Sequence, residues 1–184
     1  MGCKARYGIS NVCGDTLFPG GADADFWVGY VSDLSTRFST AQTGPITTLA
    51  FSAYNGLRRF EGQKFANKFD SEYQKGTGGN GSFIHRGTVK LITHSTQDDV
   101  EIQSLLQAQD AFVIYKNNND QFFILGASNG LTGMAGPVSS TGVASTDDVT
   151  DQVILEGVEK TKPLRFDPGT GTAAIVAYLN ARVV

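Results

Sequence analysis

The sequence predicts an α+β fold that is mainly β: an antiparallel β-sandwich or barrel with one flanking α-helix and long hairpins and loops. Three patterns support this prediction. Residues 82–93 alternate between an apolar and a more polar face, as a half-buried strand does. Residues 111–116 and 121–126 are nearly continuous apolar runs joined by an Asn-rich turn, which is typical of an antiparallel hairpin. Residues 95–109 alone have the spacing of an amphipathic helix.

Length and composition predict one globular domain. The chain has 184 residues, of which 40% are hydrophobic, and this is enough to build a packed core and to exclude wholesale disorder. A net charge of −3 gives no general attraction for nucleic acid. Because the sequence shows neither a membrane-spanning apolar run nor a signal peptide, we expect a protein without a membrane anchor that folds in a cytoplasm. We divide the single domain, 1–184, into a body, an N-terminal arm at 1–24 and a C-terminal extension at 161–184.

The first part of the chain predicts strands separated by turns. Aromatic and β-branched residues are dense at 25–31, which predicts the first strand. A second strand is predicted at 46–54, between the turn residues Gly44-Pro45 and the hairpin dipeptide Asn55-Gly56. Residues 57–73 place phenylalanines among charged side chains, so we expect an extended, partly exposed strand or pair of strands there.

The predicted helix at 95–109 has a recognisable start. Ser95 or Thr96 can cap it, and Asp98 and Asp99 lie in its first turn, where the helix dipole favours anions. The apolar stripe that we expect to face the core consists of Ile102, Leu105 and Leu106.

The last part of the chain predicts one further strand. Residues 127–150 are rich in Gly, Ser, Thr and Asp and are expected to form a long loop. Residues 151–160 have the composition of a strand, after which prolines and glycines end the regular pattern. Residues 172–184 are expected to form a short apolar tail. The chain as a whole therefore predicts six to eight strands and one helix.

Two motifs match catalytic or cofactor signatures without the context that those signatures require. Residues 76–81 match Gly-x-Gly-x-x-Gly, but the next element is a strand instead of the helix that holds a pyrophosphate, so a flexible hairpin loop is favoured. Residues 169–172 have the same weakness. His85 and His94 are accompanied by no nucleophile motif, and His85 alternates with apolar residues, which favours a structural role.

The cysteines and paired carboxylates also favour ordinary roles. Cys3 and Cys13 form no Cys-x-x-Cys pair, so a structural zinc site would need both distant histidines. The acidic pair at 98–99 is explained by the helix start, and the pair at 147–148 lacks the ligand spacing of a calcium loop. We therefore predict no catalytic residue, no cofactor and no metal, and we do not expect an enzyme.

The charged and aromatic stretch 57–73 predicts a protein interface. Its basic residues are interleaved with Glu61, Asp70 and Glu72, so the local charge nearly cancels and a nucleic-acid surface is disfavoured. Aromatic residues and Arg are enriched at interfaces, and long hairpins expose strand edges that neighbouring subunits can cover. The residues that we expect to mediate self-association are Arg58, Arg59, Phe60, Lys64, Phe65, Lys68, Phe69 and Tyr73. The loop 126–151 and both terminal arms are expected to extend this surface.

The run 111–131 contains an apolar strand, an Asn-Asn turn, an aromatic strand, Leu-Gly and then Asn-Gly-Leu. Other features accompany it in a recognisable order: an early Cys13-Gly14-Asp15 before an aromatic strand, a charged hairpin before a Gly-rich loop and long strand, a short acidic helix, and Asp147-Asp148 before Val-Ile-Leu-Glu-Gly. Together these pieces resemble the major tail tube proteins of bacteriophages, a family of small tail structural proteins. The resemblance spans about residues 10–160.

This resemblance implies a virion structural protein. It implies a β-barrel or sandwich with a flanking helix that forms hexameric rings, stacked into a hollow tail tube in contact with other tail proteins. DNA passes through the lumen at genome ejection without specific binding. The C-terminal piece 164–184 departs from the family pattern, so a ring, terminator or adaptor protein of the phage neck or tail stays open. A small-molecule-binding β-barrel is the alternative from a different class, although the sequence lacks the expected meander and secretion signal.

Overall fold

The computed structural model describes residues 21–38, 44–63, 66–76, 80–91, 95–136, 139–140, 150–169 and 171–184. The features named above that lie outside these ranges are most of the expected N-terminal arm, Cys3, Cys13, Lys64, Phe65, His94 and the Asp147-Asp148 pair.

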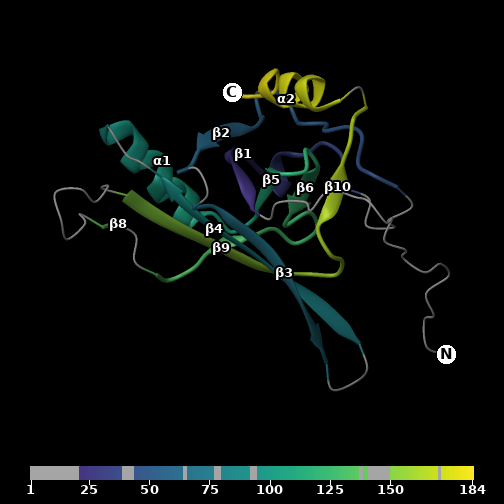
Figure 1. Ribbon diagram of the computed structural model, residues 1–184, viewed down its shortest axis with the longest axis horizontal. Coiled ribbons are helices and arrows are strands. Elements are labelled where there is room, and N and C mark those ends of the chain that lie inside the picture. Colours follow the sequence, from purple (N-terminus) through teal and green to yellow (C-terminus); the bar gives the residue numbers. More distant parts are fainter. Residues whose placement is uncertain are drawn as a thin grey trace, which may run out of the picture.

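Two five-stranded antiparallel sheets form the fold (Figure 1). The first, in the order β10-β6-β5-β1-β2, consists of β1 (Ala22–Tyr30), β2 (Arg58–Glu61), β5 (Ala111–Asn117), β6 (Phe122–Leu125) and β10 (Leu164–Phe166). The second has the order β3-β4-β9-β7, with β8 also paired to β9, and consists of β3 (Lys68–Lys75), β4 (Gly81–Leu91), β7 (Thr132–Gly133), β8 (Ser139–Ser140) and β9 (Thr150–Glu159). The mainly β, α+β prediction is confirmed as a sandwich, because the described strands do not close into a barrel.

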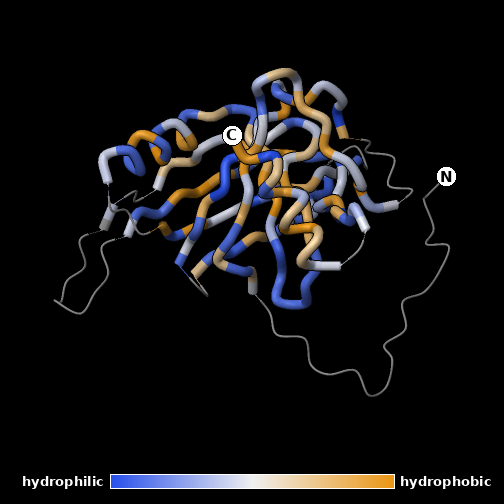
Figure 2. The backbone as a smooth tube through the Cα atoms, turned by 90° about the horizontal axis from the view of Figure 1, so that it is seen from above, coloured by the Kyte–Doolittle hydropathy of each residue, from blue (hydrophilic) through white to orange (hydrophobic). Residues whose placement is uncertain are grey.

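The first sheet lies in the middle of the molecule and is buried on both faces. One face, which includes Trp27 and Ile124, packs against the C-terminal helix and the segment that follows β1. The other face, which includes Phe26 and Val113, packs against the second sheet. Figure 2 shows the hydrophobic, orange part of the trace concentrated in the central strands. Burial on both faces explains why β1, β5 and β6 are nearly continuously apolar.

The second sheet alternates, as the sequence predicts for 82–93. In β4, His85, Val89 and Leu91 are buried toward the first sheet, whereas Arg86 on the opposite face is exposed. The alternation of residues in 82–93 therefore predicts both that this segment is a strand and which of its two faces is buried.

The predicted hairpin at 111–126 is confirmed as β5 and β6. The side-chain Oδ1 of Asn117 accepts hydrogen bonds from the main-chain N–H groups of Asn119, at 3.0 Å, and Gln121, at 2.9 Å. Asp120 completes the turn with a positive φ of 59°. The Asn-rich sequence forms this turn because the Asn117 side chain supplies a hydrogen-bond acceptor for main-chain N–H groups within the turn.

The helix predicted at 95–109 is confirmed as α1 (Thr96–Gln107), and Ser95 is its N-cap. The Ser95 hydroxyl accepts a hydrogen bond from the N–H of Asp98 at 3.3 Å, and the Asp98 carboxylate accepts one from the N–H of Ser95 at 2.9 Å. This reciprocal capping box satisfies two main-chain donors at the helix start. Ile102 and Leu105 are buried, as the stripe predicts.

The prediction of a single helix was wrong. Residues 172–180 form a second helix, α2 (Thr172–Asn180), where we expected a short apolar tail. α2 buries Ile175 and Leu179, and the indole Nε1 of Trp27 donates a hydrogen bond to Asn180 Oδ1 at 3.0 Å. Nine mostly apolar residues give no amphipathic period, so the local pattern did not reveal the helix. The C-terminal extension thus belongs to the core of the domain.

The strand predicted at 46–54 is not formed either. Ile46 and Phe51 take part only in isolated bridges. The main-chain N–H of Leu49 donates instead to the hydroxyl of Tyr178 in α2, at 2.8 Å. The segment therefore covers the first sheet with its apolar side chains but does not join it, and a short 3₁₀ turn (Val31–Asp33) leads into it.

Candidate self-association surfaces

The residues predicted to mediate self-association do not form one surface. Residues 57–73 are not one hairpin, because β2 pairs with β1 in the first sheet, whereas β3 pairs with β4 in the second. Lys64 and Phe65 in the connection lie outside the described residues. A short, two-sided polar strand has the same pattern whichever sheet it joins, so its partner cannot be inferred from its own residues. β2 carries Arg58, Arg59 and Phe60, and β3 carries Lys68, Phe69 and Tyr73.

The side chains predicted on β2 are engaged within the subunit. The guanidinium of Arg59 donates two hydrogen bonds to the carboxylate of Asp25, at 2.9 and 3.0 Å. Arg58 lies 3.6 Å from the carboxylate of Asp33. Phe60 packs against the core between the two sheets. These contacts hold the predicted side chains of β2 within the subunit, and residues 182–184 and β4 bond to the two ends of its outer main-chain edge.

On β3, one predicted aromatic residue is structural and the other is exposed. The ring of Phe69 stacks on that of Tyr115, with 4.4 Å between centroids, and burial raises the pKa of Tyr115 to about 12. Lys68 forms an exposed ion pair with its neighbour Asp70, which contributes little to stability. Tyr73, in contrast, is 54% exposed. Among the described aromatic residues of the predicted set, Tyr73 is therefore the one whose side chain is largely exposed.

β3 is an eight-residue edge strand, and in the described chain it pairs only with β4. The N–H of Gly76 donates to the carbonyl of Asn80 where the hairpin closes. This bond fixes which main-chain groups point toward β4, because the direction alternates along an antiparallel strand. The main-chain groups that point away from β4, toward the open edge, belong to Phe69, Ser71, Tyr73 and Lys75.

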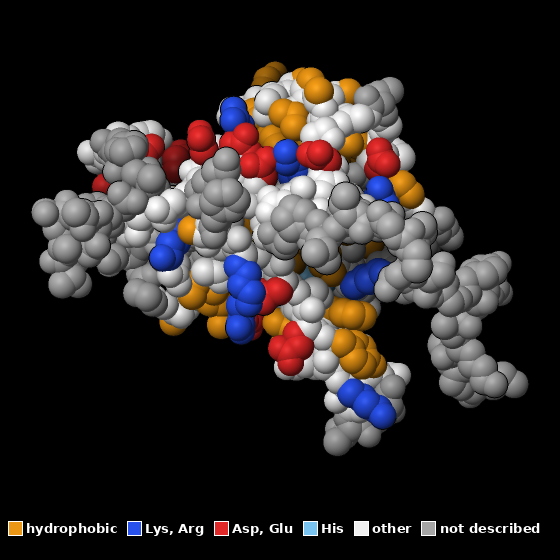
Figure 3. All heavy atoms as spheres, in the orientation of Figure 1, with side chains coloured by type: hydrophobic (Ala, Val, Ile, Leu, Met, Phe, Trp, Pro, Cys, Tyr) orange, Lys and Arg blue, Asp and Glu red, His pale blue; other side chains and the backbone are white. Residues whose placement is uncertain are grey.

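The far end of the β3–β4 hairpin projects beyond the rest of the described fold (Figure 1). On one face of it the ring of Tyr73 lies 5.2 Å from that of Phe83. On the other face Ile84 is paired with Val158, which is 54% exposed. Figure 3 shows hydrophobic and basic side chains together on this projection. The hairpin therefore presents apolar side chains and an open strand edge at the same place.

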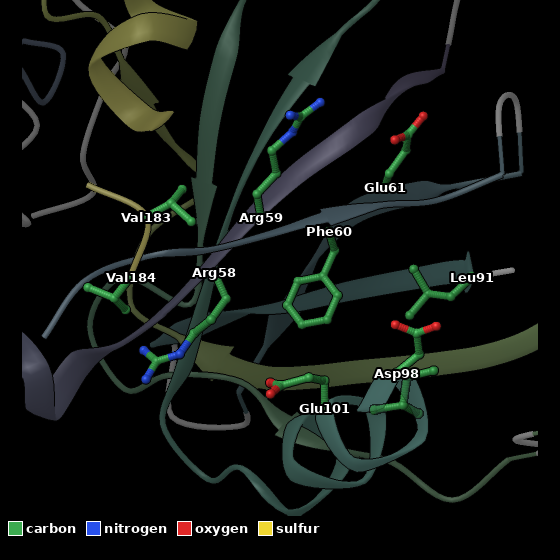
Figure 4. Close-up of a pocket in the computed structure, with 10 residues that line it drawn as sticks. Arg58, Arg59, Phe60, Glu61, Leu91, Asp98, Glu101, Val183 and Val184 are labelled. Carbon is green, nitrogen blue, oxygen red and sulfur yellow. The ribbon is translucent and has the colours of Figure 1, made fainter. Parts of the chain in front are cut away.

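A groove of about 550 Å³ lies between β2, α1 and residues 183–184 (Figure 4). Phe60, Leu91 and Ile102 contribute apolar lining. Asp98 and Glu101 point from α1 toward β2. The groove therefore combines an apolar lining with an acidic wall, next to the edge strand of the first sheet.

Two buried titratable residues hold the loop that follows β6. The carboxylate of Glu159, which is 1% exposed, accepts hydrogen bonds from the main-chain N–H groups of residues 128–130. Nδ1 of His85 accepts a hydrogen bond from the N–H of Gly126 at 3.2 Å, and burial lowers the pKa of this imidazole. His85 is thus a buried strand residue, as its alternation predicts. Glu159 was missed because a Glu at the end of a strand pattern is usually solvated.

The described residues show no metal-binding cluster, no membrane-spanning helix and no dinucleotide-binding loop. They contain no group of three or more His, Cys, Asp or Glu side chains placed to hold a metal ion. None of the described helices is long and apolar enough to cross a membrane. The Gly-rich segment 76–81 joins two antiparallel strands, β3 and β4, so it lacks the strand-to-helix context of a dinucleotide site.

Comparisons with family models, with curated proteins and with solved structures found no match for this chain. The likeness to tail tube proteins therefore rests on the sequence passages described above.

Proposed function

We propose that this chain is a virion structural protein, the tail tube subunit of a tailed bacteriophage. Copies associate side by side into hexameric rings, and stacked rings form the channel for genome delivery, in contact with other tail proteins. DNA passes through this channel without specific binding. The observation that supports self-assembly best is the open eight-residue edge of β3 on a hairpin that projects from the domain.

An edge of this length is a liability for a monomer. Proteins normally shorten, bend or cover an edge strand, because its unpaired N–H and C=O groups form a template for another strand. In the proposed ring, a strand of the neighbouring subunit pairs with the edge of β3, and Tyr73 supplies an aromatic anchor beside it. A head-to-tail contact of this kind closes into a ring when the rotation between copies fits, and stacking then extends the ring into a tube.

The two-sheet architecture does not favour the alternative function, a small-molecule-binding β-barrel. The described strands form two separate open sheets, and the space between them is filled by side chains such as Phe26, Val89 and Val113. The alternative of a ring or terminator protein uses the same edge of β3 for association. It predicts that assembly stops at single rings, whereas a tube subunit is expected to form long stacks of rings.

The test is to remove one outward-pointing donor from the edge. Ser71→Pro deletes an N–H that faces away from β4, so the pairing with β4 is kept, and proline is tolerated on edge strands. Ser71→Ala is the matched control, because it keeps the N–H. Assembly is measured by light scattering after size exclusion and by negative-stain electron microscopy, and circular dichroism checks that each variant is folded.

We expect tubes of uniform width from the wild type and from Ser71→Ala, and folded monomers from Ser71→Pro. Tyr73→Ser, which leaves the main chain unchanged, should weaken assembly as a second, independent variant. A wild-type protein that stays monomeric over days at tens of micromolar, a concentration at which specific interfaces of standard size are formed, contradicts the proposal. Rings that never stack favour the terminator alternative.

A further inference from the structure

The β3–β4 hairpin carries an aromatic side chain that is already ordered. The ring of Tyr73 lies across Gly81 on the neighbouring strand, where a Cβ would overlap it, and its centroid is 5.2 Å from that of Phe83. These two neighbours support the ring from one side, while Tyr73 remains half-exposed on the other. An aromatic side chain that is already ordered loses little conformational entropy when it binds, so Tyr73 is a favourable anchor for a partner.

A basic side chain lies next to this anchor. Tyr73 and Lys75 are separated by one residue on β3, so their side chains point to the same face of the hairpin. Lys75 is exposed and forms no ion pair with any described residue. One face of the hairpin therefore presents an aromatic ring beside a positive charge that has no partner in the described chain.

The groove between β2 and α1 has the complementary chemistry. Phe60 and the exposed residues Val183 and Val184 supply apolar surface (Figure 4). On the side of α1, the carboxylate of Glu101 accepts a hydrogen bond from the side chain of Gln97 at 3.0 Å and forms no ion pair with any described residue. The groove thus fits an aromatic ring that is accompanied by a cation.

The basic residues of the groove do not neutralise this acidic wall. Arg58 lies 3.6 Å from the carboxylate of Asp33, which is outside the lining. Arg59 donates to the carboxylate of Asp25, which is also outside the lining. Since both guanidinium groups are paired elsewhere, the carboxylate of Glu101 can take a cation from another copy.

The hairpin end and the groove lie at opposite ends of one strand. β4 begins at Gly81, against the ring of Tyr73, and ends at Leu91, which lines the groove. Its eleven extended residues separate the two places by about 33 Å. Figure 1 shows the hairpin projecting away from α1 and β2. A hairpin therefore cannot reach the groove of its own copy, and a contact between them has to form between two copies.

We propose that the groove receives the β3–β4 hairpin of a neighbouring copy, with the ring of Tyr73 on the apolar lining and the ammonium group of Lys75 paired with Glu101. This inference rests on the proposed self-association and names the surface that receives Tyr73. The two copies use different surfaces, so each copy gives one hairpin and accepts another, as a head-to-tail contact requires. Burial of the ring supplies affinity, and the charge pair fixes the orientation of the hairpin.

The test is a charge exchange between two full-length variants, Lys75→Glu and Glu101→Lys. Both substitutions leave the main chain of β3 unchanged, so pairing at its open edge is kept. Glu72→Lys is the matched control, because it changes the charge as Glu101→Lys does but lies on the other face of the hairpin, opposite Ile84. Each protein is checked for folding by circular dichroism, and the concentration at which half of it is assembled is measured by light scattering.

We expect Lys75→Glu and Glu101→Lys each to need at least about tenfold more protein for assembly, because like charges then face each other in every contact. An equal mixture of the two should assemble like the wild type, because in alternating copies each hairpin meets an oppositely charged groove. The control Glu72→Lys should differ from the wild type by less than about twofold, since an exposed charge outside the contact contributes little.

The remaining outcomes separate this inference from the proposed function. Wild-type assembly together with unchanged assembly of both variants overturns the contact between hairpin and groove and leaves the proposed function standing. Weakened assembly of both variants without rescue in the mixture also overturns it, because the two charges then act at separate places. A wild type that does not assemble overturns both proposals.

Discussion

Both carboxylate oxygens of Glu159 lie 3.1 Å from the main-chain nitrogen of Ser128, although the two residues are 31 positions apart in the sequence. The N–H groups of Asn129 and Gly130 point at the same carboxylate. Gly126 and Gly130 have positive φ angles of 72° and 84°. These conformations turn the loop so that successive main-chain N–H groups point at the Glu159 carboxylate, an arrangement called a nest. A buried carboxylate without hydrogen-bond donors destabilises the folded state. The burial of Glu159 at the end of β9 therefore depends on the conformation of the loop after β6, and the loop conformation depends on Glu159.

Glu159→Gln should lower the free energy of unfolding by roughly 2 kcal/mol, because hydrogen bonds to a charged acceptor are lost and an amide N–H₂ faces the donors. Chemical denaturation measures this loss. Glu156→Gln is the matched control on the same strand: Glu156 is paired with Arg86, whose side chain is 55% exposed, and its loss should cost less than about 1 kcal/mol. Equal losses in the two variants would show that the nest adds nothing.

The stability of the protein should fall in mild acid because of His85. Burial is the largest influence and lowers the pKa of its folded imidazole, with the charge of Glu159 acting in the opposite direction, whereas the unfolded value is about 6.5. Between the two pKa values the unfolded chain binds more protons than the folded chain, so the free energy of unfolding decreases as pH falls below about 6.5.

His85→Asn tests this dependence, since the Asn carbonyl can still accept from Gly126. Thermal melts of both proteins at a series of pH values between about 8 and 5, spanning the unfolded pKa, should show a smaller acid-induced loss in the variant. Parallel pH curves for the two proteins contradict the assignment to His85.

α2 should be required for the stability of the whole domain. Leu179 is completely buried against the first sheet, so Leu179→Ala leaves a cavity and should cost about 2–5 kcal/mol. Trp27 is the one tryptophan of the chain and is 1% exposed, so its fluorescence reports the unfolding directly. Val100→Ala in α1 is the control, because Val100 is 51% exposed and should change stability by no more than about 0.5 kcal/mol. A similar, small effect of both substitutions would mean that α2 is not part of the cooperative unit.

Tyr54 holds a strained main-chain conformation at the surface. It has a positive φ of 66° and is fully exposed, so no burial offsets the strain. Tyr54→Asn should raise the midpoint of thermal unfolding, with a gain on the order of 0.5 kcal/mol, because Asn adopts this conformation more readily. Tyr54→Val should lower the midpoint, because β-branched residues adopt it least readily. The reverse order of the two variants would contradict the strain argument.

The sequence by itself determined the elements whose pattern is local. The alternation in β4, the capping box that begins at Ser95 and the side-chain acceptor of Asn117 each act within a few residues, so the strand, the helix and the hairpin turn follow from neighbouring residues alone. The proportion of apolar residues also indicated a packed core, and the strand patterns indicated a mainly β fold.

Only the tertiary structure decided which sheet each part of 57–73 joins, that residues 172–180 form a helix, and that Glu159 is buried. β2 and β3 have similar mixed patterns, and their partners β1 and β4 belong to different sheets. α2 is short and is stabilised by packing on Trp27 and its neighbours more than by its own propensity. Glu159 is buried because a loop 31 positions away supplies its donors. Contacts between distant parts of the chain carry no signal in the local sequence, which is why these three features had to be seen in the folded protein.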